Sequence, residues 1–195
     1  MIIRGSLRQY HIKQPKIKDL RVTPYTVRNE LIKTISYKLP SSNVLDLFAG
    51  SGSLGLDSIS CGARSATFVD IHEDSVRKIR ETLKALNLVG RGRVHQESCE
   101  KYLSRALDHE YDIVFFTPPY ENLHLFLLPR IRRIIKDNGL LIVEHPPSLS
   151  VDKIGESSKT FNIIKTFNFG WSRLTLLSPN LTNGELTGDQ PINDT

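Results

Sequence analysis

The chain has 195 residues, of which 39% are hydrophobic and 24% charged, and a formal net charge of +5, which is typical of one globular domain that buries a core of its own. It has no apolar run of the ~18 residues that a membrane span needs, and its start does not resemble a signal peptide, so we expect a soluble cytoplasmic protein. Cys61 and Cys99 lie far apart without a CxxC motif, which gives no support for a disulfide framework or a metal site.

Two short alternating runs in residues 2–12 predict a β-hairpin at the start of the chain. After a polar stretch, Thr23 is placed to serve as the N-cap of a helix and Pro24 to occupy its first position. Apolar residues then recur at helical spacing as far as Leu39. We therefore expect residues 1–40 to form an extension made of a hairpin and a helix.

Positive charge is concentrated in this predicted extension. Residues 1–38 contain nine Lys and Arg residues and two acidic ones, a net charge of +7, so the remainder of the chain is slightly acidic. A basic segment on a near-neutral body is typical of proteins that bind a polyanion, although a solvated surface without a partner has the same composition. The candidate nucleic-acid-binding residues are Arg4, Arg8, Lys13, Arg21 and Arg28.

From residue 43 onward, short apolar strands alternate with amphipathic helices. The predicted strands span residues 43–48, 65–70, 92–96, 111–116 and 140–145. The predicted helices span residues 53–61, 74–87, 98–107 and 123–136, with Pro129 breaking or restarting the last of them. Alternation at this pitch indicates βαβ units, which form a parallel sheet with right-handed crossovers. The sequence therefore predicts an α/β protein.

Two further strand patterns follow, in residues 159–167 and 171–178. The link between them is too short for a helical crossover, so we expect an antiparallel pair. The tail after Pro179 is rich in Asn, Thr, Gly and Asp, which predicts disorder. The predicted organisation is thus an extension at 1–40, an α/β domain at 41–178 and a disordered tail at 179–195.

A glycine-rich loop, Gly50-x-Gly52-x-x-Gly55, lies between the first predicted strand and the helix after it. Glycines there allow the backbone to approach a ligand, and the helix N-terminus supplies free N–H groups. Asp70 ends the next strand, where its carboxylate can accept hydrogen bonds from ribose hydroxyls. Dinucleotide-binding proteins have the same pattern, so a dehydrogenase is one interpretation. A tight turn without a ligand and, for Asp70, a helix N-cap are others.

Two features favour a different ligand over a dinucleotide. Asp46 lies four residues before Gly50 at the end of the first strand, where a carboxylate suits a ligand with a cationic centre and an ammonium group better than a pyrophosphate. The second feature is the sequence TPPY at residues 117–120, directly after the buried strand at 111–116. Proline cannot donate to a sheet, so this segment lies beyond the strand end, where open α/β sheets bind ligands.

Together, the loop and the TPPY segment resemble the class I S-adenosylmethionine-dependent methyltransferases, which share a DxFxGxG loop and, in members that methylate amines, a PP-[Y/F] motif after the fourth strand. The stretches IIRGSLRQYHI, LDLFAGSGSLGLDSISCGA, IVFFTPPY and LLIVE are similar to those of the RsmD-type methyltransferases of bacteria. That family methylates N2 of a guanine in small-subunit ribosomal RNA. The resemblance implies a Rossmann-like, seven-stranded, mostly parallel sheet with a C-terminal antiparallel hairpin, and an N-terminal β-hairpin that contacts RNA.

The resemblance also implies which residues form the site. The implied catalytic residues are Thr117, Pro118, Pro119 and Tyr120, and the implied cofactor-binding residues are Asp46, Phe48, Gly50, Gly52, Gly55, Asp70, Ile71, Ser98 and Cys99. In this interpretation the Pro118 carbonyl and the Thr117 hydroxyl accept the N–H groups of the target amine, and Tyr120 stacks on the base. The family has Asp where this chain has Thr117. We expect Glu144, which ends the strand at 140–145, to be structural.

The predicted activity is therefore S-adenosylmethionine-dependent methylation of guanine N2 in small-subunit ribosomal RNA, as free RNA or in the assembled subunit, by a monomer. A hydroxyl residue before Pro-Pro-Tyr also occurs in cytosine-N4 methyltransferases, so methylation of another exocyclic amine, cytosine N4 or adenine N6 in DNA or RNA, is one alternative. A catalytically weak RNA-binding factor in ribosome assembly that retains the fold is another.

Overall fold

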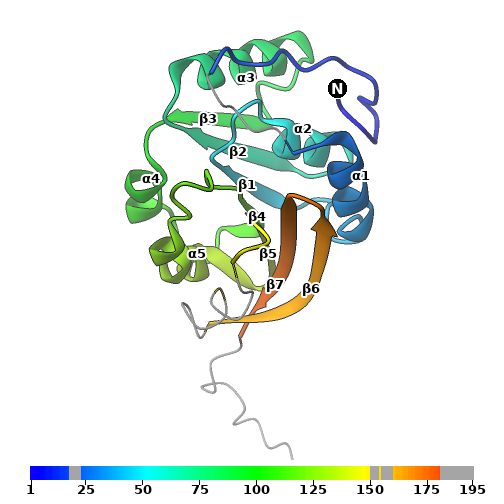
Figure 1. Ribbon diagram of the computed structural model, residues 1–195. Helices are drawn as coiled ribbons and strands as arrows, with labels where there is room; N and C mark the ends of the chain where they lie inside the picture. Colours follow the sequence, from blue (N-terminus) through cyan, green and yellow to red (C-terminus); the bar gives the residue numbers. More distant parts are fainter. Residues whose placement is uncertain (18–22, 150–153, 155–159, 181–195) are drawn as a thin grey trace, which may run out of the picture.

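A seven-stranded sheet runs through the molecule in the order β3-β2-β1-β4-β5-β7-β6 (Figure 1). The computed structural model describes residues 1–17, 23–149, 154 and 160–180. The strands are β1 (Asn43–Leu47), β2 (Ser65–Asp70), β3 (Gly92–Gln96), β4 (Tyr111–Phe116), β5 (Ile135–His145), β6 (Phe161–Phe169) and β7 (Ser172–Pro179). The strand order reverses between β1 and β4, and open α/β sheets bind their ligands at such a point.

Strands β1 to β5 pair in parallel, whereas β7 runs antiparallel to both β5 and β6. The turn Gly170-Trp171 joins β6 to β7, and Gly170 has a φ of 58°, a left-handed conformation that glycine adopts without strain. The predicted parallel sheet and its antiparallel C-terminal pair are confirmed, although both strands of the pair begin slightly later than predicted. The predicted disordered tail lies outside the described residues beyond Asn180.

The helices form two layers around the sheet (Figure 1). Helices α1 (Tyr25–Thr34), α2 (Ser53–Ser60) and α3 (Glu73–Ala85) share a first core with one face, and α4 (Cys99–Arg105) and α5 (Leu128–Ile134) share a second core with the other. In β4, Ile113 and Phe115 belong to the first core, whereas Val114 and Phe116 belong to the second. Both faces of β4 are thus covered, which explains its continuous apolar sequence. Among the helices of the described ranges, none is long and apolar enough to span a bilayer.

The β-hairpin predicted for residues 2–12 is wrong. Ile2 makes two backbone hydrogen bonds across the segment, but the residues between are turns rather than paired strands. Two backbone N–H groups of the segment donate to α2 instead of to a partner strand. The Ile3 N–H donates to the Asp57 carboxylate at 2.9 Å, and the Ser6 N–H donates to the Ser60 carbonyl at 3.0 Å. The segment therefore docks on α2 and contributes its buried isoleucines to the first core.

Helix α1 begins one residue later than predicted. Pro24, rather than Thr23, occupies the N-cap position, and the helix starts at Tyr25. The Thr23 hydroxyl instead donates a hydrogen bond to the Glu144 carboxylate at 2.8 Å. A residue predicted to cap a helix thus links the N-terminal segment to the end of β5.

Pro129 restarts the predicted fourth helix, as expected. A 3₁₀ turn (Leu125–Leu127) precedes α5, and Pro129 lies in the first turn of α5, where its missing N–H costs no hydrogen bond. Strand β5 then begins directly at Ile135, several residues before the predicted start, with an irregular register against β4 in this first part.

Candidate active site

A cavity of about 600 Å³ opens at the carboxyl ends of β1, β2, β4 and β5. Loops that follow parallel strands form its wall, as in other open α/β sheets. The predicted catalytic and cofactor-binding residues in this wall are Asp46, Phe48, Gly50, Asp70, Ile71, Ser98, Cys99, Thr117, Pro118, Pro119 and Tyr120. The fold thus brings the glycine loop and the TPPY segment, far apart in sequence, to one cavity.

Gly52 and Gly55 contact the first core, which differs from their predicted role as ligand contacts. A Cβ on Gly55 would lie 2.3 Å from the Phe68 ring, and a Cβ on Gly52 would lie 2.9 Å from the Ile79 side chain. These two glycines therefore allow α2 to pack closely on β2 and α3. Gly50 is the glycine of the motif that lines the cavity.

Asp46 is buried at the end of β1 and accepts a hydrogen bond from the Gly55 N–H at 3.0 Å. Burial raises the pKa of its carboxyl to about 8, against the lowering effect of the Gly55 N–H; the nearby carboxylates Asp70 and Asp57 raise it further. Burial thus favours the protonated form of Asp46, and its carboxyl braces the start of α2. A cationic ligand group beside it would lower this pKa and favour the carboxylate.

Asp70 orders two loops around the cavity. Its carboxylate accepts hydrogen bonds from the Gly50 N–H at 2.7 Å and from the His72 N–H at 2.8 Å. His72, not Asp70, is the N-cap residue of α3, so the helix-cap interpretation of Asp70 is wrong. Ile71, the next residue, is largely exposed and lines the cavity.

Ser98 and Cys99 approach the cavity from the start of α4. Ser98 is the N-cap residue, and its hydroxyl accepts a hydrogen bond from the Lys101 N–H at 3.2 Å. Cys99 is buried, and burial raises the pKa of its thiol to about 12. Burial thus disfavours the thiolate, which is the nucleophilic form, and Cys99 forms part of the cavity wall.

The TPPY segment follows β4 directly. The Thr117 hydroxyl donates a long hydrogen bond, 3.4 Å, to the Leu47 carbonyl of the neighbouring β1, which leaves its oxygen lone pairs able to accept. Phe48, in the left-handed conformation with a φ of 61°, packs edge-on against Phe116 with ring centroids 5.7 Å apart. Aromatic side chains thus support the wall between the glycine loop and the TPPY segment.

Glu144, expected from its sequence position to be structural, also lines this cavity. Its carboxylate accepts hydrogen bonds from the Thr23 hydroxyl at 2.8 Å and from the Ser172 hydroxyl at 3.0 Å. A signal for its place was present in the sequence, because Asp46, Asp70 and Glu144 are all acidic residues at the ends of buried strands.

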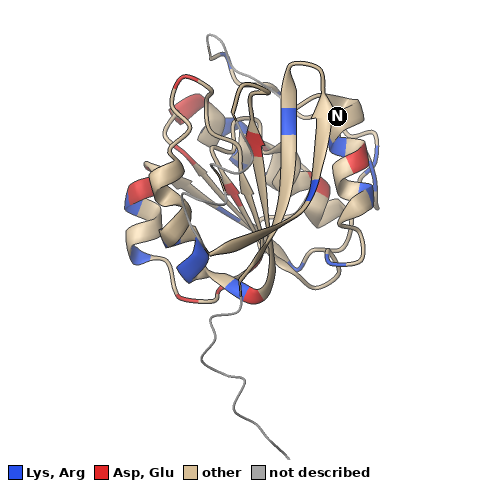
Figure 2. Cartoon of the chain, turned by 60° about the horizontal axis from the view of Figure 1, so that its bottom comes forward, with Lys and Arg blue, Asp and Glu red and all other residues tan. Residues whose placement is uncertain are grey.

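The predicted nucleic-acid-binding residues divide into two groups. Arg4, Arg8 and Lys13 are exposed; Arg4 donates to Asn29 at 2.7 Å, and Lys13 lies 3.5 Å from Glu81. Arg21 lies outside the described residues. Figure 2 shows basic residues near the N-terminus and on several helices, interspersed with acidic ones.

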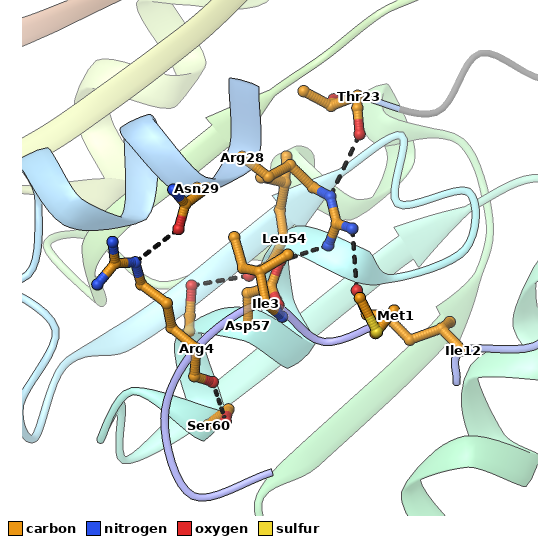
Figure 3. Close-up of polar contacts among 12 residues, drawn as sticks. Met1, Ile3, Arg4, Ile12, Thr23, Arg28, Asn29, Leu54, Asp57 and Ser60 are labelled. Carbon is orange, nitrogen blue, oxygen red and sulfur yellow. Dashed lines mark hydrogen bonds and ion pairs between the residues drawn. The ribbon is translucent and has the colours of Figure 1, made fainter. Parts of the chain in front are cut away.

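Arg28 is not available to a nucleic acid, which corrects its assignment. The residue is 4% exposed, and its guanidinium pairs with Asp57 of α2, which is fully buried (Figure 3). The same guanidinium donates to the Met1 carbonyl at 3.0 Å and to the Thr23 carbonyl at 3.2 Å. Arg28 therefore fastens the start of the chain and α1 to helix α2.

Comparison with known proteins identifies relatives over most of the chain. Residues 1–178 match the family model described as "Conserved hypothetical protein 95". Ribosomal RNA small subunit methyltransferase D of Buchnera aphidicola (from Acyrthosiphon pisum) is 29% identical over 156 residues, covering 77% of this chain and 80% of the relative. The protein of the same name from Escherichia coli K12 is 30% identical over 143 residues, covering 73% and 70%.

Solved structures share the fold. The yhhF protein of Escherichia coli superposes with a TM-score of 0.78 at 24% identity, covering 93% of this chain and 98% of that one. SMU.776, solved as a complex with SAH, gives a TM-score of 0.67 at 18% identity and covers 82% and 50%. The model match and the curated relatives show that this chain belongs to the family of RsmD-type ribosomal RNA methyltransferases.

Proposed function

We propose that this chain transfers a methyl group from S-adenosylmethionine to the exocyclic N2 amine of a guanine in small-subunit ribosomal RNA. The observation that carries the proposal is the single cavity that the glycine loop and the TPPY segment share. The names of the relatives favour ribosomal RNA of the small subunit as substrate. The proposed enzyme acts as a cytoplasmic monomer.

The residues of the cavity fit this cofactor. Asp70 offers a carboxylate for ribose hydroxyls, and Asp46 can ionise beside the amino-acid group. When bound, S-adenosylmethionine supplies an electrophilic methyl carbon on a sulfonium. The protein then needs to hold the target amine in line and accept its N–H groups, which the Pro118 carbonyl and the Thr117 hydroxyl do in this proposal. Tyr120 stacks on the flipped or unpaired base.

The proposed function predicts transfer of tritium from labelled S-adenosylmethionine to small ribosomal subunits or their RNA. Naked ribosomal RNA, assembled subunits and DNA are offered in parallel, and the labelled nucleoside is identified after digestion. We expect N2-methylguanosine at one position. Label on cytosine N4 or adenine N6 would establish the other exocyclic amine instead, and RNA binding without transfer to any substrate would favour an assembly factor.

Thr117→Val is expected to lower the single-turnover rate of methyl transfer and leave cofactor affinity unchanged. The substitution removes a hydroxyl acceptor with little change in shape, and a neutral hydrogen bond contributes about 0.5–1.5 kcal/mol, so we expect a loss of roughly 2- to 10-fold. Thr117→Asp should accelerate transfer, because charge-assisted hydrogen bonds are roughly twice as strong as neutral ones. Equal rates for Thr117→Val and wild type would make the hydroxyl structural.

The exposed basic residues at the start of the chain are expected to bind phosphates. Replacing Arg4, Arg8 and Lys13 with Ala should flatten the dependence of log K for RNA binding on log salt, by up to about 0.7–0.9 for each phosphate no longer neutralised, with cofactor binding intact. The matched control replaces Arg64, Lys84 and Arg93, which are also exposed, with Ala. If the two triple variants change the slope of log K against log salt by the same amount, the basic residues at the start of the chain form only a solvated surface.

A further inference from the structure

Glu144 and Thr117 lie at the same level of the sheet. In the parallel register of β4 and β5, Phe116 pairs with Val143. The next residue of β5 is Glu144, and Thr117 is the first residue after the end of β4. Neighbouring strands lie about 4.8 Å apart, so the register places the backbone of Glu144 level with the first residue of the TPPY segment.

The two side chains also point to the same side of the sheet. Two residues earlier, Phe115 of β4 and Ile142 of β5 pair with each other and both belong to the first core. Side chains alternate along a strand with a period of two, so Glu144 lies on that face. The same alternation, carried one residue past the end of β4, gives Thr117 that face as well. Both residues line the cavity, as this geometry requires.

The other carboxyl groups of the cavity wall are placed or engaged differently. Asp46 pairs in register with Phe115, two residues deeper along the sheet than the level of Thr117. Glu121 follows the TPPY segment and is exposed. The partners of the remaining groups are the Gly50 and His72 N–H groups for Asp70, Arg105 for Glu97 and His124 for Glu100. Glu144 is thus the buried carboxyl group of the cavity wall that the strand register places level with Thr117 and that hydroxyl groups hold.

Two hydroxyl groups of the described residues hold the Glu144 carboxylate in place. The residue is 6% exposed, and each of its two oxygens accepts one hydrogen bond, from Thr23 and from Ser172. Both of these donors are neutral. Each oxygen keeps a further lone pair that can accept a hydrogen bond.

We propose that Glu144 accepts an N–H of the target amine and takes its proton on methyl transfer, a role that rests on the proposed function. The amine nitrogen forms its bond to the methyl carbon as the carbon–sulfur bond breaks, with that electron pair left on sulfur. The nitrogen then carries a positive charge and releases one proton to the Glu144 carboxylate. The Pro118 carbonyl accepts one N–H of the amine, and Glu144 shares the other with the Thr117 hydroxyl and provides the charge that Thr117 lacks.

A binding experiment tests the interaction without turnover. The substrate RNA is prepared with guanine or with inosine, which lacks the 2-amino group, at the nucleotide that wild type methylates, and affinities are measured in the presence of SAH. Wild type should prefer the guanine RNA by roughly 10-fold or more, the value of a hydrogen bond to a charged group. Glu144→Gln should lose most of this preference, whereas Glu110→Gln, a charge-matched change on the residue preceding β4, should keep it.

Single-turnover rates provide the second measurement. Glu144→Gln should reduce methyl transfer by roughly 10²-fold or more, as expected for loss of a positioned proton acceptor, with SAH affinity and thermal unfolding close to wild type. In Glu144→Ala, added formate should restore part of the rate in proportion to its concentration, because a free carboxylate can enter the vacated volume. A residue with only a structural role would show no formate rescue.

The outcomes separate this proposal from the proposed function. If wild type methylates guanine but Glu144→Gln retains both the guanine preference and the rate, the role of Glu144 is overturned and the proposed function stands. If wild type methylates no RNA, the proposed function fails and the role of Glu144 fails with it. Loss of SAH affinity in Glu144→Gln would assign the residue to the cofactor site instead and overturn its interaction with the amine.

Discussion

Arg28→Met is expected to destabilise the folded protein by about 3–5 kcal/mol, the usual cost of removing one partner of a buried ion pair. The Asp57 carboxylate would remain in the core, where the Ile3 N–H still donates to it but no guanidinium balances its charge. The Met1 and Thr23 carbonyls would also lose their hydrogen bonds from the guanidinium. Urea unfolding of the purified variant at pH 7 measures the loss.

The matched control is Arg93→Met. Arg93 is exposed and lies 3.7 Å from Glu110, and exposed pairs of this kind contribute about 0–1 kcal/mol. A change of similar size in the two variants would mean that the buried network of Figure 3 does not hold the N-terminal segment in place.

The same network predicts a pH dependence of the free energy of unfolding. Burial raises the pKa of the Asp57 carboxyl from 3.8 to about 6, against the lowering effects of the Arg28 guanidinium and the Ile3 N–H. Between these values the folded protein binds more protons at Asp57 than the unfolded chain, so this group's contribution to stability falls as pH rises from about 4 to about 6. Without the guanidinium the pKa rises further, so the deficit of Arg28→Met relative to wild type should be larger at pH 8 than at pH 5.

Periodicity made the sheet and the cavity predictable. An apolar strand buried on both faces, such as β4, leaves a clear pattern in sequence, and the ends of parallel strands must meet at one edge. The TPPY segment and Asp70 could therefore be placed at one site from sequence. Glu144 also lies at the carboxyl end of a parallel strand, so the same rule places it at this cavity, although its position in sequence alone predicts a structural role. This matters because Glu144 lies level with Thr117, the residue that replaces the family's Asp.

The N-terminal errors have a different physical cause. The apolar side chains of residues 2–12 fill the first core without strand pairing: Ile2, Ile3 and Ile12 are buried, and Leu7 and Tyr10 pack against that core. Gly5, with a φ of 81°, allows close docking on α2, since a Cβ there would lie 1.9 Å from the Ser60 carbonyl oxygen. Composition predicts Arg28 to be a nucleic-acid-binding residue because it does not show that Asp57 is the partner of the guanidinium. The sequence signal for a buried pair is Asp57, an acidic residue between the apolar residues Leu56 and Ile59 of α2.

Asp70→Ala is expected to weaken binding of S-adenosylmethionine and SAH by more than 10-fold. In the proposed function its carboxylate accepts hydrogen bonds from the ribose, and a charge-assisted hydrogen bond contributes about 1.5–3 kcal/mol. The carboxylate also orders the Gly50 and His72 N–H groups, so its loss loosens both loops of the cavity wall. Calorimetry of the variant against Asp108→Ala, an exposed aspartate at another surface, measures the effect.

A ribose analogue separates the direct interaction from the effect on the loops. If Asp70 binds the ribose hydroxyls, wild type should lose affinity for 2′-deoxy-SAH relative to SAH, and Asp70→Ala should bind both equally. If the residue only orders the backbone, the variant should weaken both ligands by the same factor and keep the preference of wild type for SAH. Unchanged SAH affinity in Asp70→Ala, or tight binding of NAD by wild type, would instead contradict the cofactor assignment. The glycine loop and a ribose-binding Asp70 suit both S-adenosylmethionine and NAD. The TPPY segment across the cavity is the feature that favours S-adenosylmethionine, so the NAD measurement is needed beside the ribose analogue.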